Sequence, residues 1–184
     1  MKPRIYSRNM ELVGVLQHAN KVSYRRTHND LYTSSFELPF DDPKTVLCDT
    51  HFIVDIFDGD VSKGKYRILD EPDSDISDEG EFVKYSCEHV IAFLMDDVID
   101  GYLETGGEGC TTRTVLEQLL SMQGTQRWVL GRCDFDYEFQ YSWENTNLLD
   151  AVFSIPTCFA DAYHWTYDTD SYPWTLNLVH QDTD

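Results

Sequence analysis

The chain has 184 residues, enough for one domain of ordinary size or two small domains with a buried core. Its 33 acidic and 14 basic residues give a formal net charge of -19. This charge argues against a nucleic-acid or anionic-membrane surface, because such surfaces need Lys and Arg to replace counterions. The aromatic content of 14% favours a folded protein with strands over a disordered one. No apolar stretch is long enough to predict a membrane span or a secretory signal.

The first part of the chain is predicted to form strands and turns without a helix. Apolar residues alternate with polar ones, as in half-buried strands, and turn-forming residues separate them. The expected elements are a hairpin over residues 5–16, strands over 22–26 and 36–40, and a second hairpin formed by 50–57 and 64–69. Pro39 cannot donate a backbone hydrogen bond, so we expect the strand over 36–40 to lie at the edge of its sheet.

Residues 70–81 (DEPDSDISDEGE) are the one concentrated charge run. Its acidic residues are Asp70, Glu71, Asp73, Asp75, Asp78, Glu79 and Glu81. We interpret the run as a solvated loop between strands. A calcium loop is the alternative, because Asp73, Asp75 and Ser77 place oxygen ligands on alternate residues. The EF-hand pattern fails, since neither its sixth-position Gly nor its twelfth-position Glu is present.

A strand over residues 81–86 and a helix over 88–98 are expected next, the helix from its apolar stripe. Residues 101–109 (GYLETGGEG) then form a Gly-rich segment, which we predict to be a flexible connection. A phosphate site is not expected there, because the segment lacks the Lys of a P-loop and its two Glu residues would repel phosphate.

Two similar cassettes of helix and strand follow. In the first, Thr111 or Thr112 caps a helix that ends near Gly124 and precedes a strand containing Trp128. The helix stripe consists of Val115, Leu116, Leu119 and Leu120. In the second, Asn145 or Thr146 is the expected cap and Pro156 ends the helix. Its stripe consists of Leu148, Leu149, Val152 and Phe153. Both stripes are expected to be core.

The remaining aromatic residues predict three more strands. In residues 133–143 (CDFDYEFQYSW), four aromatic side chains alternate regularly, at Phe135, Tyr137, Phe139 and Tyr141. Residues 163–167 and 174–178 also alternate, and residues 168–171 between them carry turn chemistry. The sequence therefore predicts an α+β fold: an antiparallel, β-barrel-like domain over residues 1–84, followed by a mixed helix and strand domain over 85–184.

No motif predicts catalysis, a metal or a cofactor. The six histidines form no HExxH spacing, there is no GxSxG, and adjacent carboxylates such as Asp96 with Asp97 do not face one another across a cleft. The trio Cys87-Glu88-His89 would point in different directions from a helix. We therefore assign no catalytic, cofactor or metal residue. The five cysteines are uneven in spacing and odd in number, which favours free thiols and synthesis in the cytoplasm.

Several segments together resemble a phage protein family. They are residues 5–16 (IYSRNMELVGVL), 25–39 with FELP at its end, 88–97 with Glu88-His89, 114–131 (TVLEQLLSMQGTQRWVLG) and 145–178. In this order they are similar to the N-terminal region of phage tail proteins of the minor structural protein type. This is the prophage tail endopeptidase, or tail-associated lysin, family, which is related to siphophage hub proteins. Pro39, Asp41 and Asp42 depart from the family's longer polar strand.

The resemblance implies a structural component of the tail tip or baseplate hub, acting through protein contacts in assembly, host attachment or DNA delivery. It also implies partners in the distal tail ring and tail tube, a homotrimer in the full-length protein, and a place in the virion tail. Family members run well past this length, so a fragment is one expectation. Two alternatives stay open: a tail-associated endopeptidase acting on cell walls, and a soluble binding module outside phages. Neither nucleic-acid nor membrane binding is expected.

Overall fold

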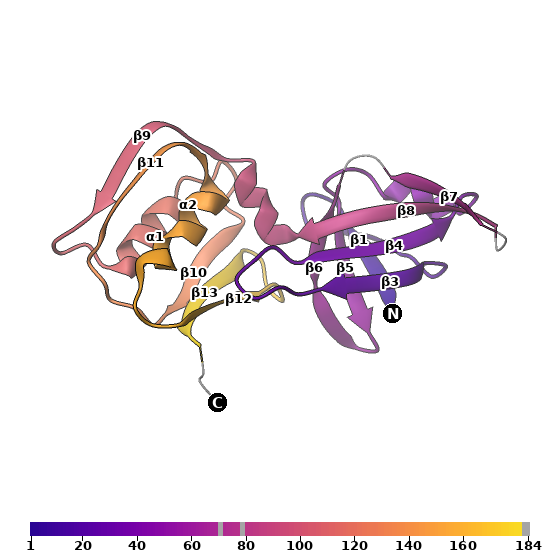
Figure 1. Cartoon of the computed structure of the whole chain (residues 1–184). Helices are drawn as coiled ribbons and strands as arrows, with labels where there is room; N and C mark the ends of the chain where they lie inside the picture. The colour runs from indigo at the N-terminus through magenta and orange to yellow at the C-terminus, as the bar shows by residue number, and fades with distance from the viewer. Residues whose placement is uncertain (70–71, 78–79, 182–184) are drawn as a thin grey trace. The chain divides into compact units, whose positions relative to one another are not determined.

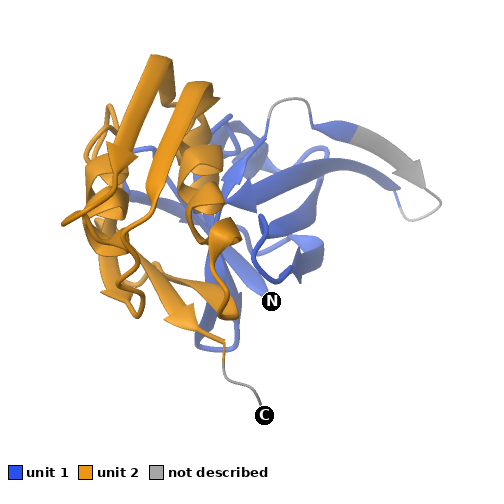
Figure 2. Ribbon diagram, turned by 60° about the vertical axis from the view of Figure 1, so that its left-hand side comes forward, with its two compact units in different colours: residues 1–90 blue, residues 91–184 orange. Residues whose placement is uncertain are grey.

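The computed structural model describes residues 1–69, 72–77 and 80–181. The chain divides into two compact units, unit 1 (Met1–Val90) and unit 2 (Ile91–Asp184), which Figure 2 shows in different colours. The sequence placed the change after residue 84, inside β8 (Gly80–His89). This strand pairs with its neighbours up to its last residue, so the whole strand belongs to unit 1.

Unit 1 is one sheet of eight described strands (Figure 1). Seven of them follow one another as hydrogen-bonded, antiparallel neighbours. The strands are β1 (Lys2–Tyr6), β2 (Leu12–Val15), β3 (Asn20–Arg25), β4 (Thr33–Pro39), β5 (Ile53–Asp58), β6 (Val61–Ile68), β7 (Asp73–Ser77) and β8. Their order is β2-β1-β5-β6-β8-β4-β3, and β7 pairs with β8 beside this path. The two predicted hairpins are confirmed. The ladder does not close on itself, so the sheet is open where a barrel-like form was expected.

The core of unit 1 follows the predicted alternation along its strands. Phe36 and Leu38 on β4 are fully buried, and the Phe36 ring stacks on Tyr85 of β8 with ring centroids 4.9 Å apart. The same cluster contains Ile5, Leu16, Val54, Ile56, Tyr66, Ile68 and Cys87. Because alternate residues of each strand point to one face, these strands bury one continuous apolar layer.

The prediction that β4 is an edge strand is wrong. It lies between β8 and β3. Pro39 is tolerated there because it is the last residue of β4, and β3 pairs with β4 only as far as Glu37 opposite Asn20. The missing N–H of Pro39 therefore lies beyond the end of the neighbouring strand, where no ladder bond is lost.

Part of the acidic run is a strand rather than a loop. Residues Asp73–Ser77 form β7, which pairs antiparallel with β8, with Asp73 opposite Lys84. The run's strongly acidic composition hid this strand, because only Ile76 is apolar and no alternation was visible. Residues 70, 71, 78 and 79 lie outside the described residues. The three residues of the calcium alternative, Asp73, Asp75 and Ser77, all lie on β7 rather than in a loop.

Unit 2 combines a three-stranded sheet, a two-stranded ribbon and short helices. The elements are the 3-10 helix η2 (Val90–Met95, beginning at the last residue of unit 1), β9 (Val98–Gly106), α1 (Thr112–Leu120), β10 (Trp128–Cys133), β11 (Gln140–Asn147), α2 (Leu148–Ser154), the 3-10 helix η3 (Ile155–Cys158), β12 (Tyr163–Asp168) and β13 (Trp174–His180). The sheet has the order β10-β13-β12, with β10 parallel to β13, and the ribbon pairs β9 with β11 (Figure 1). The α+β class is thus confirmed.

Both predicted helix–strand cassettes exist, with shifted boundaries. Thr111 caps α1, as expected, by accepting from the Thr114 backbone N–H, but the helix ends at Leu120, with Ser121 as its C-cap, rather than near Gly124. In the second cassette the ribbon strand continues through Asn145 and Thr146. The cap is therefore Asn147, whose side chain accepts from the Asp150 backbone N–H at 2.9 Å. Pro156 follows the end of α2, as predicted, and lies in the first turn of η3.

Three further predictions of local structure are corrected. The expected helix over 88–98 is only the 3-10 turn η2, because β8 runs to His89 and β9 begins at Val98. The Gly-rich segment over 101–109 is largely strand, since β9 runs to Gly106 and pairs with β11, while Gly101 and Gly106 take positive φ angles within it. Of the strand expected over 133–143, only its two ends lie in β10 and β11, and residues 134–139 join them without a ladder.

The four tryptophans all lie in unit 2 and are buried there. Trp128 and Trp174 lie opposite one another on β10 and β13, with ring centroids 5.3 Å apart. Trp165 on β12 stacks on Phe153 of α2 at 5.6 Å. The helix stripes and these strands therefore share one core, as the stripes predicted. In the described part of the chain, no helix has the length and apolar character needed to cross a membrane.

Candidate interaction surfaces

The polar residues that the sequence analysis weighed for chemistry have structural roles. Asp42 caps the 3-10 helix η1 (Pro43–Leu47) by accepting from the Lys44 backbone N–H at 2.8 Å. It also pairs with the His18 ring at 2.7 Å. These hydrogen bonds, the backbone one first, hold the pKa of Asp42 below its usual value. Asp97 accepts from the Gly124 backbone N–H at 3.0 Å, which ties the start of β9 to the end of the α1 segment.

The trio Cys87-Glu88-His89 lies on a strand, not at a helix start. Cys87 and His89 are buried, while Glu88 forms an ion pair with Arg67 at 2.6 Å. Burial lowers the pKa of His89 to about 3, so its imidazole is neutral at physiological pH. No group of three potential metal ligands comes together among residues 1–69, 72–77 and 80–181. All five cysteines are free thiols.

A second ion pair, which is buried, joins the two strands of the β5–β6 hairpin. Lys65 Nζ lies 2.8 Å from Asp55 Oδ2, and both side chains are at least nine-tenths buried. The Ser62 hydroxyl donates to Asp55 Oδ1 at 2.6 Å. A buried charge needs such partners, since its desolvation is otherwise expensive. No pattern in the sequence indicated this pair, because each residue alone fits a solvated strand position.

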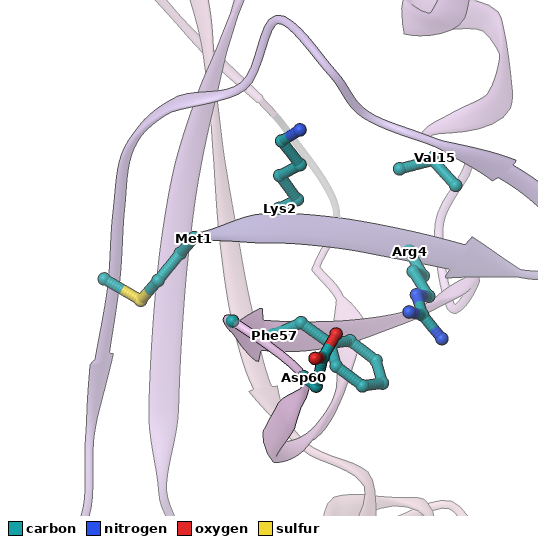
Figure 3. A pocket seen from close by; sticks show the side chains of 7 residues that line it. Met1, Lys2, Arg4, Val15, Phe57 and Asp60 are labelled. Atoms are coloured by element: carbon teal, nitrogen blue, oxygen red, sulfur yellow. The ribbon is translucent and has the colours of Figure 1, made fainter.

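One cavity of unit 1, of about 450 Å³, lies along β1 and the β5–β6 turn (Figure 3). It is lined by Met1, Lys2, Arg4, Val15, Phe57, Gly59 and Asp60. The Arg4 guanidinium lies 3.8 Å from the centroid of the Phe57 ring, a cation–π contact that fixes both side chains. None of the residues singled out by the sequence lies in this cavity. Its lining combines two cationic side chains and one carboxylate with apolar residues.

The β3 edge of the unit 1 sheet is basic and aromatic. Tyr24, Arg25 and Arg26 are exposed, and β3 pairs with β4 alone in the described ladder. Arg26 donates to the Lys63 carbonyl at 2.7 Å, and its guanidinium lies 5.6 Å from the Tyr24 ring. Tyr and Arg are the residue types that most often dominate protein–protein interfaces.

The inner face of the β9–β11 ribbon is anchored to the helices of unit 2. Tyr141 and Trp143 stack almost parallel, at an interplanar angle of 4°. Trp143 donates its indole N–H to the Ser154 hydroxyl at the end of α2, at 2.9 Å. On the other strand, the Thr105 hydroxyl donates to Gln118 of α1 at 2.5 Å. The ribbon is therefore a fixed platform, although it has only two strands.

The outer face of this ribbon carries exposed apolar side chains among carboxylates. Val98 and Tyr102 are 63% and 65% exposed. Tyr102 lies opposite Glu144 and donates its hydroxyl hydrogen to Glu104 at 2.8 Å. The Gln140 side chain also donates to Glu104. A large aromatic residue that is left in water among charged groups is typical of a contact surface.

The aromatic row predicted in residues 133–143 exists, although most of it is not a strand. Phe135, Tyr137 and Phe139 stack in succession, with centroids 6.2 and 5.2 Å apart, and all three rings pack around Phe159. Phe135 is buried, while Phe139 is 38% exposed. The period of two was therefore read correctly, because an extended segment alternates its side chains whether or not it has a hydrogen-bonded neighbour.

The buried side chain of Gln123 connects α1 to β10, and the sequence analysis missed it. Its amide donates to the carbonyls of Leu120 and Trp128 at 2.6 and 2.8 Å, and its oxygen accepts from the Trp128 backbone N–H at 3.0 Å. One amide thus satisfies backbone groups at the helix end and at the strand start. A polar residue close after an apolar helix stripe was the only available signal.

The fold matches phage tail proteins. The chain is similar to the prophage tail protein gp18 from Listeria monocytogenes, with a TM-score of 0.62 and 13% identity over 97% of this chain and 50% of that protein. It is also similar to the 43 kDa tail protein of prophage MuSo2 from Shewanella oneidensis, with a TM-score of 0.62 and 10% identity over 100% and 55% of the two chains. The fold expected from the sequence resemblance is therefore confirmed.

A third similar structure comes from a secretion system. It is the E. coli c3393 protein, a component of the type VI secretion system with structural similarity to the T4 tail proteins gp27 and gp5. Here the TM-score is 0.58 and the identity 12%, over 85% of this chain and 45% of that protein. The present chain spans about half the length of these proteins. No family model and no curated protein sequence matches the chain.

Proposed function

We propose that this chain is a structural segment of a phage tail-tip or baseplate hub and that it works through contacts with other tail proteins. The observation that carries the proposal is the match of nearly the whole chain, both units included, to tail proteins. The sequence segments that resemble the hub family point to the same role, in the same order along the chain.

The surfaces of the two units support a contact function. Unit 1 presents the basic, aromatic β3 edge, and unit 2 presents Val98 and Tyr102 on an anchored ribbon. The hub role implies neighbours in the distal tail ring and tail tube, a trimer of the full-length protein, and a place in the virion tail after synthesis in the host cytoplasm.

The endopeptidase alternative has less support. The residues with catalytic potential that the sequence offered are engaged in caps, ion pairs or the core, as for Asp42, Glu88 and His89. We therefore propose that this segment is not an enzyme. Zymography of the purified chain on cell walls tests this point. A cleared band that persists when the chain is produced in a host without related cell-wall hydrolases would favour the endopeptidase alternative.

Mass spectrometry of purified virions from the induced host tests the hub role. The tryptic peptide Thr114–Arg127 should be present at a few copies per particle, in proportion to other tail-tip proteins. Its absence from particles whose other tail proteins are well covered would overturn the proposal and favour a binding module outside phages.

A further inference from the structure

We propose that the outer face of the β9–β11 ribbon of one copy binds the β3 edge of a second copy, in a head-to-tail contact. This inference rests on the proposed hub function, because it names the surfaces through which copies of the chain would meet. Its support comes from the distribution of charge and exposed aromatic residues over the chain.

Charge is divided unevenly along the chain. Unit 1 has 11 basic and 17 acidic residues, whereas unit 2 has 3 basic and 16 acidic residues. Seven of the acidic residues of unit 1 belong to the run over 70–81, so the rest of that unit is close to neutral. Unit 2 therefore repels another unit 2, and its favourable partner within a second copy is a basic part of unit 1.

The ribbon face has the composition of an interface. Tyr102 is exposed at its centre with Glu104 and Glu144 beside it, and Val98 and Asp100 are exposed nearer the start of β9, beyond a shift of register. The register places Glu144 directly opposite Tyr102 and Ser142 opposite Glu104, so that these side chains share one face. An apolar centre with a charged rim is the usual arrangement of a protein–protein contact.

The β3 edge offers the complementary chemistry. Arg25 provides an exposed guanidinium group, which can bind a carboxylate with two parallel hydrogen bonds, and Arg26, which donates to the Lys63 carbonyl, adds a second positive charge. Tyr24, 37% exposed, adds an aromatic ring beside them. In the described ladder β3 has a neighbour strand on one side only, so its other side can approach a flat strand surface.

The contact uses two different surfaces, so each copy keeps one surface of each kind available after a pair forms. Repetition of such a heterologous contact produces a closed ring if the rotation closes. The proposed trimer is one such ring. The contact is also expected to weaken with salt, because its specificity comes from exposed charges.

Sedimentation equilibrium of charge-reversed variants tests the contact. The unchanged chain should self-associate at about 20 mM salt and much less at about 500 mM salt, where the Debye length falls from roughly 20 Å to roughly 4 Å. Arg25→Glu with Arg26→Glu, and separately Glu104→Lys with Glu144→Lys, should each weaken self-association at least about tenfold by making the facing charges alike.

Matched controls separate the contact from a general effect of charge. Lys2→Glu with Lys84→Glu changes the charge of unit 1 equally, and Asp136→Lys with Asp170→Lys does so for unit 2, all at exposed positions outside the two surfaces. These variants should associate like the unchanged chain. Mixing the two reversed variants, or combining all four reversals in one chain, should restore association, which also shows that the variants are folded.

A chain that stays monomeric at low salt, or reversed variants that associate like their controls, would overturn the inference. The virion test distinguishes this failure from that of the proposed function. A chain found in tail particles but monomeric in solution contradicts only the head-to-tail contact, whereas absence from the particles contradicts the hub role itself.

Discussion

The two units have similar lengths but reach stability by different means. Unit 1 is one antiparallel sheet that contains a buried ion pair, Lys65 with Asp55, and a partly buried one, Arg67 with Glu88. Unit 2 divides its strands between a sheet and a ribbon and buries all four tryptophans. The two units of this acidic chain therefore differ in what they bury. Unit 1 buries charged side chains, whereas unit 2 buries aromatic rings and carries most of its charge as exposed carboxylates.

The difference provides a separate probe for each unit. Tryptophan fluorescence reports unit 2 alone, since unit 1 contains no tryptophan. Hydrogen exchange of β5 and β6 reports the sheet of unit 1. Mutations in one unit should therefore move one signal more than the other.

The largest expected effect comes from breaking the buried ion pair of unit 1. Lys65→Met leaves the Asp55 carboxylate buried without its cation, beside the Ser62 hydroxyl that donates to it, and should reduce the free energy of unfolding by about 3–5 kcal/mol. Hydrogen exchange in β5 and β6 measures the loss. In Lys65→Met combined with Asp55→Val no charge remains buried, and most of the stability should return. An equal loss in both variants would show that packing, not the unpaired charge, is responsible.

The next effect is a pH dependence specific to unit 1. His89 contacts the rings of Tyr32 and Tyr66, and burial, followed by the charge of Arg26, lowers its pKa to about 3 from an ordinary value of 6.5. In this window the unfolded chain binds a proton that the folded chain does not. Stability should thus fall as pH drops from about 6.5 to 3, by up to about 1.4 kcal/mol per pH unit.

His89→Gln is the matched variant, because its side chain stays neutral at every pH. Denaturant unfolding across this window should give a smaller slope for the variant than for the unchanged chain. Carboxylates with a lowered pKa, such as Asp42, also destabilise the fold on acidification, but they do so equally in both proteins. Identical slopes would contradict the role of His89.

A smaller effect tests the helix cap of unit 2. Asn147→Ala removes the side chain that accepts from the Asp150 backbone N–H and should cost about 1 kcal/mol. Thermal unfolding followed by tryptophan fluorescence measures this change. Thr146→Ala is the control, since its hydroxyl bonds only to the Glu144 carbonyl near the surface. A larger loss of stability for Thr146→Ala than for Asn147→Ala would indicate that Thr146 is the cap, as the sequence first suggested.

The last prediction is that the chain does not bind DNA. The net charge of -19 should prevent a detectable complex with duplex DNA even at low salt. An electrophoretic mobility assay checks this, and the same property would let DNA pass an acidic hub surface without adhering. A micromolar complex would contradict the expectation, and the Arg25→Glu with Arg26→Glu variant would show whether the β3 edge causes it.

The sequence predicted elements with strong periodicity and missed those set by partners distant in the chain. The Val115 and Leu148 stripes, the hairpin over 5–16 and the strand over 50–57 depended on local patterns, and all are present. The ribbon strand β9 was missed because its glycines resemble a loop, and its strand form depends on pairing with β11, which lies more than thirty residues later.

The candidate surfaces were even less visible in the sequence. Tyr102 and Val98 are exposed on the ribbon that β9 and β11 form, and no pattern in the sequence pointed to either residue. Spacing along the chain gives the face of a strand, but not whether that face is covered. The expected edge position of β4 failed for the same reason, since Pro39 lies beyond the end of β3.

The order β10-β13-β12 has a consequence for synthesis on the ribosome. Its central strand is the last of the three to be translated, so β10 and β12 have no common partner until Trp174–His180 has emerged. Unit 1 can complete its sheet once residue 90 is available, whereas unit 2 must wait with Trp128 and the stripes of α1 and α2 uncovered. For that interval the nascent second unit is a natural client for chaperones.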